Sequence, residues 1–188
     1  MNKERYLLVV SGPSGAGKDT VVSRLLQMHP ELEESVSATT RQPRAGEEEG
    51  VNYFFMTNDQ FEQKIARGEM LEYVNYCGNY YGTPKSEVDR RIDAGITVVL
   101  VIEVVGAANI KRMYPDSTLV FIMPPSVEEL GRRLRARGTE DADVVARRMD
   151  RAREEMARAG EYDFSVVNDQ VDQCAEELYE IIKRRQQA

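Results

Sequence analysis

Four short and almost wholly apolar runs alternate along the chain with segments whose apolar residues recur at helical spacing. The apolar runs cover residues 6–11, 97–105, 118–123 and 164–167. Runs of this kind are typical of strands that are buried on both faces of a parallel sheet. The helical pattern occupies residues 18–28, 126–137, 143–159 and 171–185. The alternation predicts an α/β fold, with a parallel sheet core covered by helices on both faces.

Two stretches interrupt this alternation. Residues 37–93 are rich in Gly, Tyr and Glu, and NYFFMT and MLEYVNYCGNYYG within them look like short strands that end in turns. We expect a small insertion there, with its own mixed or antiparallel sheet. Residues 127–159 are helical and rich in arginine. We therefore expect one domain, residues 1–188, whose core comprises residues 1–36, 94–126 and 160–188.

The composition of the 188 residues excludes several classes of protein. With 41% apolar and 30% charged residues, the chain is not collagen-like, not a disulfide-rich miniprotein and not wholly disordered. Its 25 Lys and Arg against 32 Asp and Glu give a net charge of −7, which repels polyanions. Even residues 127–158 carry nine Arg against eight Asp and Glu, so they form no uniformly basic face. We expect no nucleic-acid partner.

Targeting signals are also missing from the sequence. No apolar run approaches the roughly 20 residues that cross a bilayer, and the amino terminus runs into turn residues rather than a cleavage site. These features predict a soluble cytoplasmic protein without a membrane partner. Cys77 and Cys174 have no neighbouring His or Cys that would complete a zinc site, and we expect both thiols to be reduced.

The most specific signal is GPSGAGKD, residues 12–19, which directly follows the first predicted strand and opens the first predicted helix. This context matches a GxxxxGK[ST] phosphate loop, whose glycines let backbone amides point at phosphate oxygens. Lys18 is placed to reach the outer phosphates. The predicted nucleotide-binding residues are Gly12, Pro13, Ser14, Gly15, Ala16, Gly17, Lys18, Asp19 and Thr20.

The last position of the loop departs from the pattern. Where Ser or Thr would put a hydroxyl on Mg²⁺, this chain has Asp19, followed by Thr20. A carboxylate is also a hard oxygen ligand, and it could bind the ion directly or through water. It adds negative charge beside an anionic nucleotide, so the sequence leaves open whether Asp19 or Thr20 contacts the metal.

A second anion site is suggested by SATTRQPRAGEEEGVNY in the insertion. Arg41 and Arg44 flank Pro43, which keeps the preceding residue extended and the loop open. Two guanidinium groups and the hydroxyl of Tyr53 could converge on one phosphate, because arginine is suited to bidentate phosphate contact. From spacing alone, two solvated loop arginines are an equally good interpretation.

Several motifs occur in order over nearly the whole chain. They are GPSGAGK, SATTRQPRAGEEEGVNY, GNYYGTP, IEVVGA, PPSVEELGRRLRARGTE and YDFSVVND. Together they resemble the guanylate kinase family. The resemblance implies a P-loop nucleoside monophosphate kinase fold, with a GMP-binding insertion at 37–93 and a lid at 127–159. It also implies transfer of the γ-phosphoryl group of ATP to GMP, with Mg²⁺ accompanying ATP.

The resemblance assigns the acceptor site. It implies that the GMP phosphate contacts Arg41, Arg44, Tyr53 and Tyr81, and that the base faces Ser37, Glu72 and Thr83. The chemistry of Glu72 agrees, since guanine presents N1–H and an amino group as adjacent donors to two carboxylate oxygens. Glu103 is the one charge within ITVVLVIEVV, at the carboxyl end of a predicted parallel strand, and is also expected to contact GMP. The family usually has a second acidic residue two positions earlier, where this chain has Val101.

The remaining assignments concern the donor and the transferring group. Arg133 and Arg137 are four residues apart on one helical face, and Arg148 lies on the next helix. By resemblance these three arginines close over the phosphoryl group, with Lys18 and Arg41 also catalytic. Asn168 is expected near the adenine of ATP, although no motif excludes GTP. A general base is unnecessary, because a phosphate oxygen of GMP is already an anionic nucleophile.

Two alternatives remain. Ribose 1,5-bisphosphate phosphokinase is a relative whose loop also contains GKD, but Glu72 with Tyr53 and Tyr81 suits a guanine better than a bare sugar phosphate. Guanylate kinase-like peptide-binding modules keep the fold without catalysis, and the intact Lys18 and arginine set argue against that class. The sequence does not determine the oligomeric state.

Overall fold

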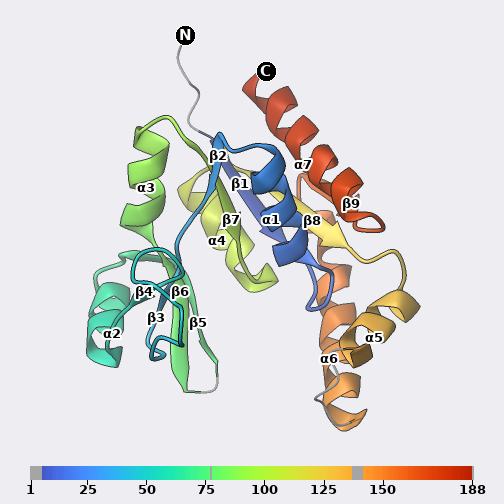
Figure 1. Ribbon diagram of the computed structural model, residues 1–188, viewed down its shortest axis with the longest axis horizontal. Coiled ribbons are helices and arrows are strands. Elements are labelled where there is room, and N and C mark those ends of the chain that lie inside the picture. The colour runs from blue at the N-terminus through green and yellow to red at the C-terminus, as the bar shows by residue number, and fades with distance from the viewer. Residues whose placement is uncertain (1–5, 77, 137–141, 188) are drawn as a thin grey trace.

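A computed structural model describes residues 6–76, 78–136 and 142–187. Its larger sheet has five parallel strands in the order β2-β7-β1-β8-β9. They are β2 (Leu32–Glu34), β7 (Thr97–Val101), β1 (Tyr6–Ser11), β8 (Thr118–Met123) and β9 (Phe164–Val167) (Figure 1). The predicted parallel core is therefore confirmed, with β1, β8 and β9 at the predicted residues.

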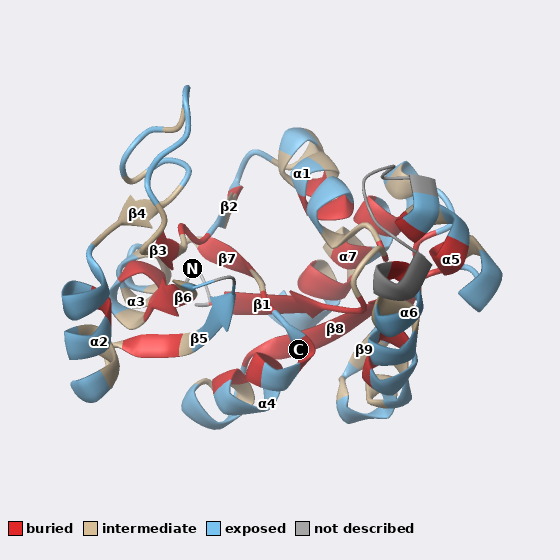
Figure 2. Cartoon of the chain, turned by 90° about the horizontal axis from the view of Figure 1, so that it is seen from below, coloured by how far each residue is buried: buried red, intermediate tan, exposed pale blue. Residues whose placement is uncertain are grey.

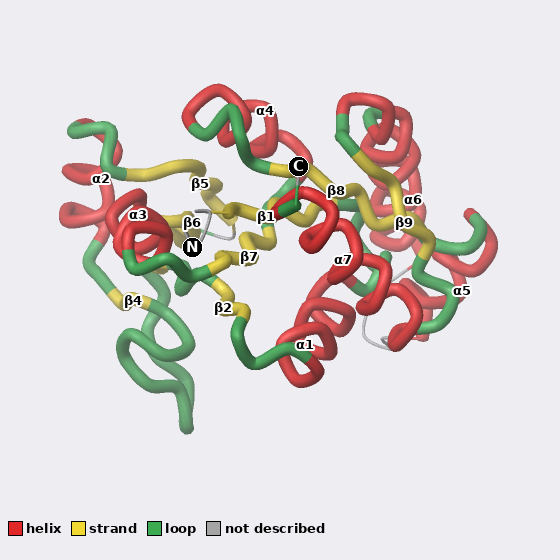
Figure 3. Tube along the Cα trace, turned by 90° about the horizontal axis from the view of Figure 1, so that it is seen from above, coloured by secondary structure: helices red, strands yellow, loops and turns green. Residues whose placement is uncertain are grey.

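Successive side chains of a strand point to opposite sides of the sheet. Since both sides are apolar here, helices cover both faces. On β1, Leu8 and Val10 pack in one core cluster with α1 (Lys18–Met28) and α7 (Val171–Gln186). Leu7 and Val9 pack in a second cluster with α4 (Val104–Met113). Figure 3 shows α4 on one side of the sheet and α1 and α7 on the other, and in Figure 2 β1 and β8 are buried between them.

The smaller sheet lies in the insertion and is mixed. Its order is β4-β3-β6-β5, in which β3 pairs parallel with β4 and antiparallel with β6, and β5 pairs antiparallel with β6. The strands are β3 (Ala38–Thr39), β4 (Phe54–Phe55), β5 (Met70–Tyr76) and β6 (Asn79–Pro84). The predicted mixed sheet is confirmed. Two helices also form here that the sequence analysis did not predict, α2 (Asn58–Ala66) and α3 (Lys85–Asp93).

One predicted element was wrong in its extent. The strand expected over residues 97–105 ends at Val101, and α4 begins at Val104. The first turn of α4 is as apolar as the strand before it, and periodicity alone does not separate a short buried strand from a buried helical turn. Glu103 is consequently the N-cap residue of α4, in an extended conformation with φ −67° and ψ 150°.

The arginine-rich segment forms α5 (Val127–Ala136) and α6 (Ala142–Ala157), followed by a short 3₁₀ turn at Ala159–Glu161. The two helices share a small core of their own, made by Leu130, Leu134, Val145 and Ala152. They lie across the molecule from the mixed sheet (Figure 1). Over the residues that the structure describes, no helix is long and apolar enough to cross a membrane.

Candidate active site

The phosphate loop connects β1 to α1 in the expected position. Gly12, Gly15 and Gly17 all have positive φ, of 152°, 88° and 88°. The ammonium group of Lys18 turns back over the loop and donates to the carbonyl oxygens of Gly12 at 2.7 Å and Pro13 at 3.3 Å. The lysine side chain thus folds back onto the backbone of the loop.

Two of these glycines are required by space as well as by conformation. A Cβ at Gly12 would lie 2.3 Å from the carbonyl oxygen of Ile122 on β8. A Cβ at Gly17 would lie 2.5 Å from Nδ2 of Asn168. The loop therefore packs directly against β8 and the segment after β9, which holds its backbone in place.

Two arginines, one on α5 and one on α6, contact the glycine-rich loop. Arg133 on α5 donates from Nη1 to the carbonyl oxygen of Ala16 at 3.4 Å, and from Nε to Glu129 at 2.8 Å. Arg148 on α6 donates from Nη2 to Oγ of Ser14 at 2.8 Å. Residues more than a hundred positions apart in the chain thus meet at one glycine-rich loop. Arg137 lies outside the described residues.

Asn168 contacts the same loop. Its side chain is almost completely buried, and Nδ2 donates to the carbonyl oxygen of Ala16 at 2.8 Å. Its own carbonyl oxygen accepts from Nη2 of Arg133 at 3.1 Å. Asn168 therefore links the loop to α5, a structural role that the sequence analysis did not anticipate.

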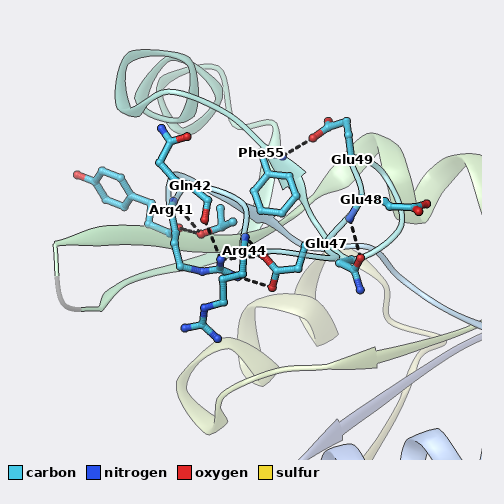
Figure 4. Close-up of polar contacts among 10 residues, drawn as sticks. Arg41, Gln42, Arg44, Glu47, Glu48, Glu49 and Phe55 are labelled. Atoms are coloured by element: carbon cyan, nitrogen blue, oxygen red, sulfur yellow. Dashed lines mark hydrogen bonds and ion pairs between the residues drawn. The ribbon is translucent and has the colours of Figure 1, made fainter.

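In the insertion, Arg41 forms a paired hydrogen bond with Glu47 (Figure 4). Nη1 and Nη2 each donate to one carboxylate oxygen at 2.9 Å, and both side chains are largely buried. These bonds, with one from the backbone N–H of Arg44, lower the pKa of Glu47 to about 2. Glu47 also raises the pKa of Arg41, so both groups are ionised at neutral pH.

Two tyrosines surround this arginine. Its guanidinium carbon lies 5.4 Å from the ring centre of Tyr53, a cation–π distance. The ring of Tyr53 meets that of Tyr81 edge to face at 6.2 Å, and Tyr81 is a further contributor to the raised pKa of Arg41. The structure thus brings Arg41, Tyr53 and Tyr81 together. The side chain of Arg44 is exposed, on the same loop.

Glu72 and Thr83 face each other across β5 and β6. The threonine hydroxyl donates to Oε1 of Glu72 at 2.8 Å, and the two residues are register partners in the sheet. Burial raises the pKa of Glu72, the hydrogen bond from Thr83 opposes the rise, and the negative charge of Glu103 adds to it. Ser37 is half-buried just before β3, and its carbonyl oxygen accepts from the backbone N–H of Phe54.

Glu103 pairs with a residue on α6. Its carboxylate accepts from Nη2 of Arg151 on α6 at 3.1 Å, and Arg151 also donates from Nε to Glu155 at 2.8 Å. Arg151 and Glu103 are more than half exposed, so the pair itself is expected to contribute little to stability. It nevertheless joins the amino-terminal end of α4 to α6.

The chain matches the family model for guanylate kinase over residues 4–185. A guanylate kinase from Synechococcus sp. (strain CC9902) is 51% identical over 92% of this chain and 92% of its own length. One from Lactococcus lactis is 49% identical over 96% of this chain and 89% of its own. The chain belongs to the guanylate kinase family.

Solved structures agree with this assignment. The crystal structure of guanylate kinase from Anaplasma phagocytophilum matches with a TM-score of 0.76 and 32% identity, over 97% of this chain and 87% of that one. A shikimate kinase from Bacteroides thetaiotaomicron, at 14% identity and a TM-score of 0.52, shares only the fold. The guanylate kinase family and its fold, inferred from the sequence, are confirmed.

Some features of this guanylate kinase site were not predicted. Glu47 lies inside a motif that was recognised, but its partner could not be identified because a run of three glutamates usually marks a solvated loop. Gly106 packs on Glu72 from α4, an element that was itself missed. The pairing of Arg151 with Glu103 is a contact between distant segments that no local pattern indicates.

Proposed function

We propose that this chain is an ATP-dependent guanylate kinase, which transfers the γ-phosphoryl group of ATP to GMP and gives ADP and GDP. The observation that carries the acceptor assignment is the partly buried Glu72, hydrogen-bonded to Thr83. A carboxylate there can accept from both N1–H and the amino group of guanine. Adenine lacks these two donors on that edge, and would leave the carboxylate unpaired at a large cost in binding.

The donor side comprises residues 12–20 with Asn168. Backbone amides of the loop and the amino end of α1 would hold the β- and γ-phosphates of ATP, with Lys18 reaching the outer oxygens. Lys18, Arg133 and Arg148 already meet at this loop through their contacts with Gly12, Ala16 and Ser14. Three cations from separate elements would offset the charge that develops on the transferring group.

The acceptor side comprises the insertion, residues 37–93, and Glu103. Arg41, Arg44, Tyr53 and Tyr81 would bind the phosphate of GMP, and Ser37, Glu72 and Thr83 its base. Residues 127–159, including Arg137, would act as a lid that excludes water as a competing acceptor. The phosphate oxygen of GMP is itself the nucleophile, so positioning and charge neutralisation are the chemistry required of the chain.

Magnesium would accompany ATP at the start of α1. Kinases usually hold Mg²⁺ through one or two protein oxygens together with substrate phosphates and water. Asp19 and Thr20 offer hard oxygen donors, are exposed, and directly follow Lys18, so their chemistry fits this ion. Bound there, Mg²⁺ would neutralise charge on the phosphates of ATP. We place the reaction in purine nucleotide metabolism in the cytoplasm.

A coupled assay of ADP formation tests the proposal. The acceptors to compare are GMP, dGMP, AMP and ribose 1,5-bisphosphate, each with ATP and with GTP as donor. We expect turnover with GMP, and little with AMP or the sugar bisphosphate. Turnover with ribose 1,5-bisphosphate alone would instead support the relative whose loop also contains GKD, and inactivity with every acceptor would favour a binding module.

Variants of the loop test the role of Lys18. Lys18→Ala should lose most of the activity, because the outer phosphates lose their principal cation, whereas Asp19→Ser, one residue along, should retain it. Normal turnover by Lys18→Ala would refute the assignment of that lysine. Removing Mg²⁺ with a chelator should stop turnover by the wild-type chain.

A further inference from the structure

Glu47 hydrogen-bonds to both Arg41 and Arg44, which lie on the same loop. Its Oε1 accepts from Nη2 of Arg41, and its Oε2 accepts from Nη1 of Arg41 and from the backbone N–H of Arg44, at 2.7 to 2.9 Å. The Glu47 side chain is only 18% exposed and that of Arg41 only 15%. One carboxylate therefore determines the position of the Arg41 side chain and of the Arg44 backbone.

The bonds of Arg41 to Glu47 and Gln42 use the Nη1 side of its guanidinium and leave the Nε edge to other partners. A guanidinium group carries five N–H donors in a plane. Nη1 directs its two donors at Glu47 and at the carbonyl oxygen of Gln42, and Nη2 directs one at Glu47. The donors on Nε and Nη2 that face neither Glu47 nor Gln42 lie parallel on the adjoining edge, and Tyr81, an expected ligand of the same phosphate, also hydrogen-bonds to this guanidinium. Parallel donors of this kind match two oxygens of one phosphate group.

Aromatic rings hold the plane of the same guanidinium. Its carbon lies 5.4 Å from the ring centre of Tyr53 and 5.9 Å from that of Phe55. The neighbouring acid Glu49 supports this arrangement, since it accepts from the backbone N–H of Phe55 at 2.8 Å. Arg41 is thus restrained by Glu47 along its Nη edge and by two neighbouring rings on one side of its cation.

We propose that Glu47 is a positioning residue for the acceptor phosphate: it holds Arg41 by the Nη edge so that the Nε edge meets the phosphate of GMP. The inference deepens the proposed function and rests on it. Glu47 does not contact the substrate in this arrangement. If it instead occupied the phosphate position as an internal anion, removing its charge would tighten GMP binding, which is the opposite result.

The loop offers a matched control in Glu48. The backbone N–H of Glu48 donates to Asn52, while its side chain is exposed and is directed away from Arg41 (Figure 4). Glu47→Gln and Glu48→Gln each remove one negative charge from adjacent positions of the same loop. Only the first removes the ionic partner of Arg41.

The experiment measures steady-state kinetics and the binding of GMP and guanosine by calorimetry, after wild-type turnover with GMP is established. Glu47→Gln should raise the KM for GMP by about 10- to 100-fold, with the KM for ATP within about twofold. Its affinity for GMP should fall while its affinity for guanosine stays near that of the wild type. Glu47→Asp, which keeps the charge, should recover part of the loss, and Glu48→Gln should resemble the wild type.

Three results would overturn the inference. The first is an equal KM for GMP in the Glu47→Gln and Glu48→Gln variants, and the second is tighter GMP binding by Glu47→Gln. The third is an equal loss of affinity for GMP and for guanosine, which would mean that Glu47 only supports the fold of the insertion. Each differs from failure of the proposed function, which would appear as a wild-type chain that does not phosphorylate GMP.

Discussion

Gly106 on α4 lies directly against the side chain of Glu72 on β5. A Cβ at position 106 would stand 3.2 Å from Cβ and 3.4 Å from Cγ of the glutamate. The side-chain hydrogen at Gly106 thus lets the helix approach the mixed sheet closely, and the helix forms one wall behind the carboxylate. The position of Glu72 depends on this contact as well as on its hydrogen bond with Thr83.

Gly106→Ala should therefore affect substrate binding more than stability. Alanine favours a helix over glycine by up to about 1 kcal/mol, which offsets the tighter contact. The glutamate must shift by a few tenths of an ångström to accommodate the methyl group, and we expect the KM for GMP to rise about 3- to 10-fold. Chemical denaturation and kinetics of the same preparation test this, and a large loss of stability with normal GMP kinetics would contradict it.

Glu72→Gln should increase stability at neutral pH while it weakens catalysis. The folded chain raises the pKa of Glu72 above its ordinary value of 4.5, so the native state holds this proton more tightly than the unfolded state does. The contribution of Glu72 to the free energy of unfolding therefore decreases as pH rises from 4.5 through the pKa of the folded state. Glutamine avoids that cost but offers guanine one acceptor fewer, which should lower kcat/KM for GMP by about 10- to 100-fold.

The pH dependence is the sharper measurement. The stability advantage of Glu72→Gln should be present at pH 7 and should vanish below pH 4.5, where Glu72 is protonated in both states of the wild type. The exposed Glu48→Gln serves as the control that removes the same charge. An advantage for Glu72→Gln that does not change with pH would show that the ionisation of Glu72 is not its source.

Gly12→Ala should destabilise the folded chain strongly. The methyl group would lie 2.3 Å from a backbone oxygen of Ile122, and the residue has φ +152°. A backbone neighbour cannot rotate away, so we expect a loss of at least about 2 kcal/mol in the free energy of unfolding. Gly160→Ala, with no atom within 4 Å of the added Cβ, should stay within about 0.5 kcal/mol of the wild type. Similar free energies of unfolding for both variants would show that the loop backbone can move to accommodate the methyl group.

Cys174 should resist alkylation in the native chain. Burial in the core raises the pKa of its thiol to about 12, and Glu177 adds to the rise. At pH 8 the reactive thiolate is then about one part in ten thousand. Mass spectrometry of the peptide containing Cys174 should find little iodoacetamide adduct before unfolding and complete modification in guanidinium chloride. Rapid labelling of this residue in the native state would show that α7 opens readily.

The parts of the fold that were predictable depend on local pattern. The strand Tyr6–Ser11 and the helix Lys18–Met28 form where expected, because an apolar run, a glycine loop and a helical stripe follow one another with clear boundaries. The first turn of α4 continues an apolar strand and gave no such boundary. The helix α2 did carry a local signal that was overlooked, since Thr57 and Gln60 form a capping box at its start.

The candidate site divides in the same way. Lys18 and its loop follow from one contiguous motif, and the family pattern supplied Arg41, Glu72 and Arg133 as candidates. The contacts that orient them could not be predicted, because they join residues through the folded chain. Arg133 meets the carbonyl oxygen of Asn168, and Glu103 meets Arg151, across separations that no periodicity encodes.

Strand β2 pairs directly with β7, with Leu32 opposite Thr97, and the backbone N–H of Ser35 donates to the carbonyl oxygen of Val99 at 3.0 Å. The chain therefore leaves the parallel sheet after β2 and re-enters it at the adjacent strand β7. Backbone hydrogen bonds, which do not depend on side-chain identity, hold these two points together. The mixed-sheet segment is thus inserted between two neighbouring strands of the parallel sheet. Under the proposed function, exchange of this segment would change the monophosphate that is accepted while the parallel sheet keeps its register.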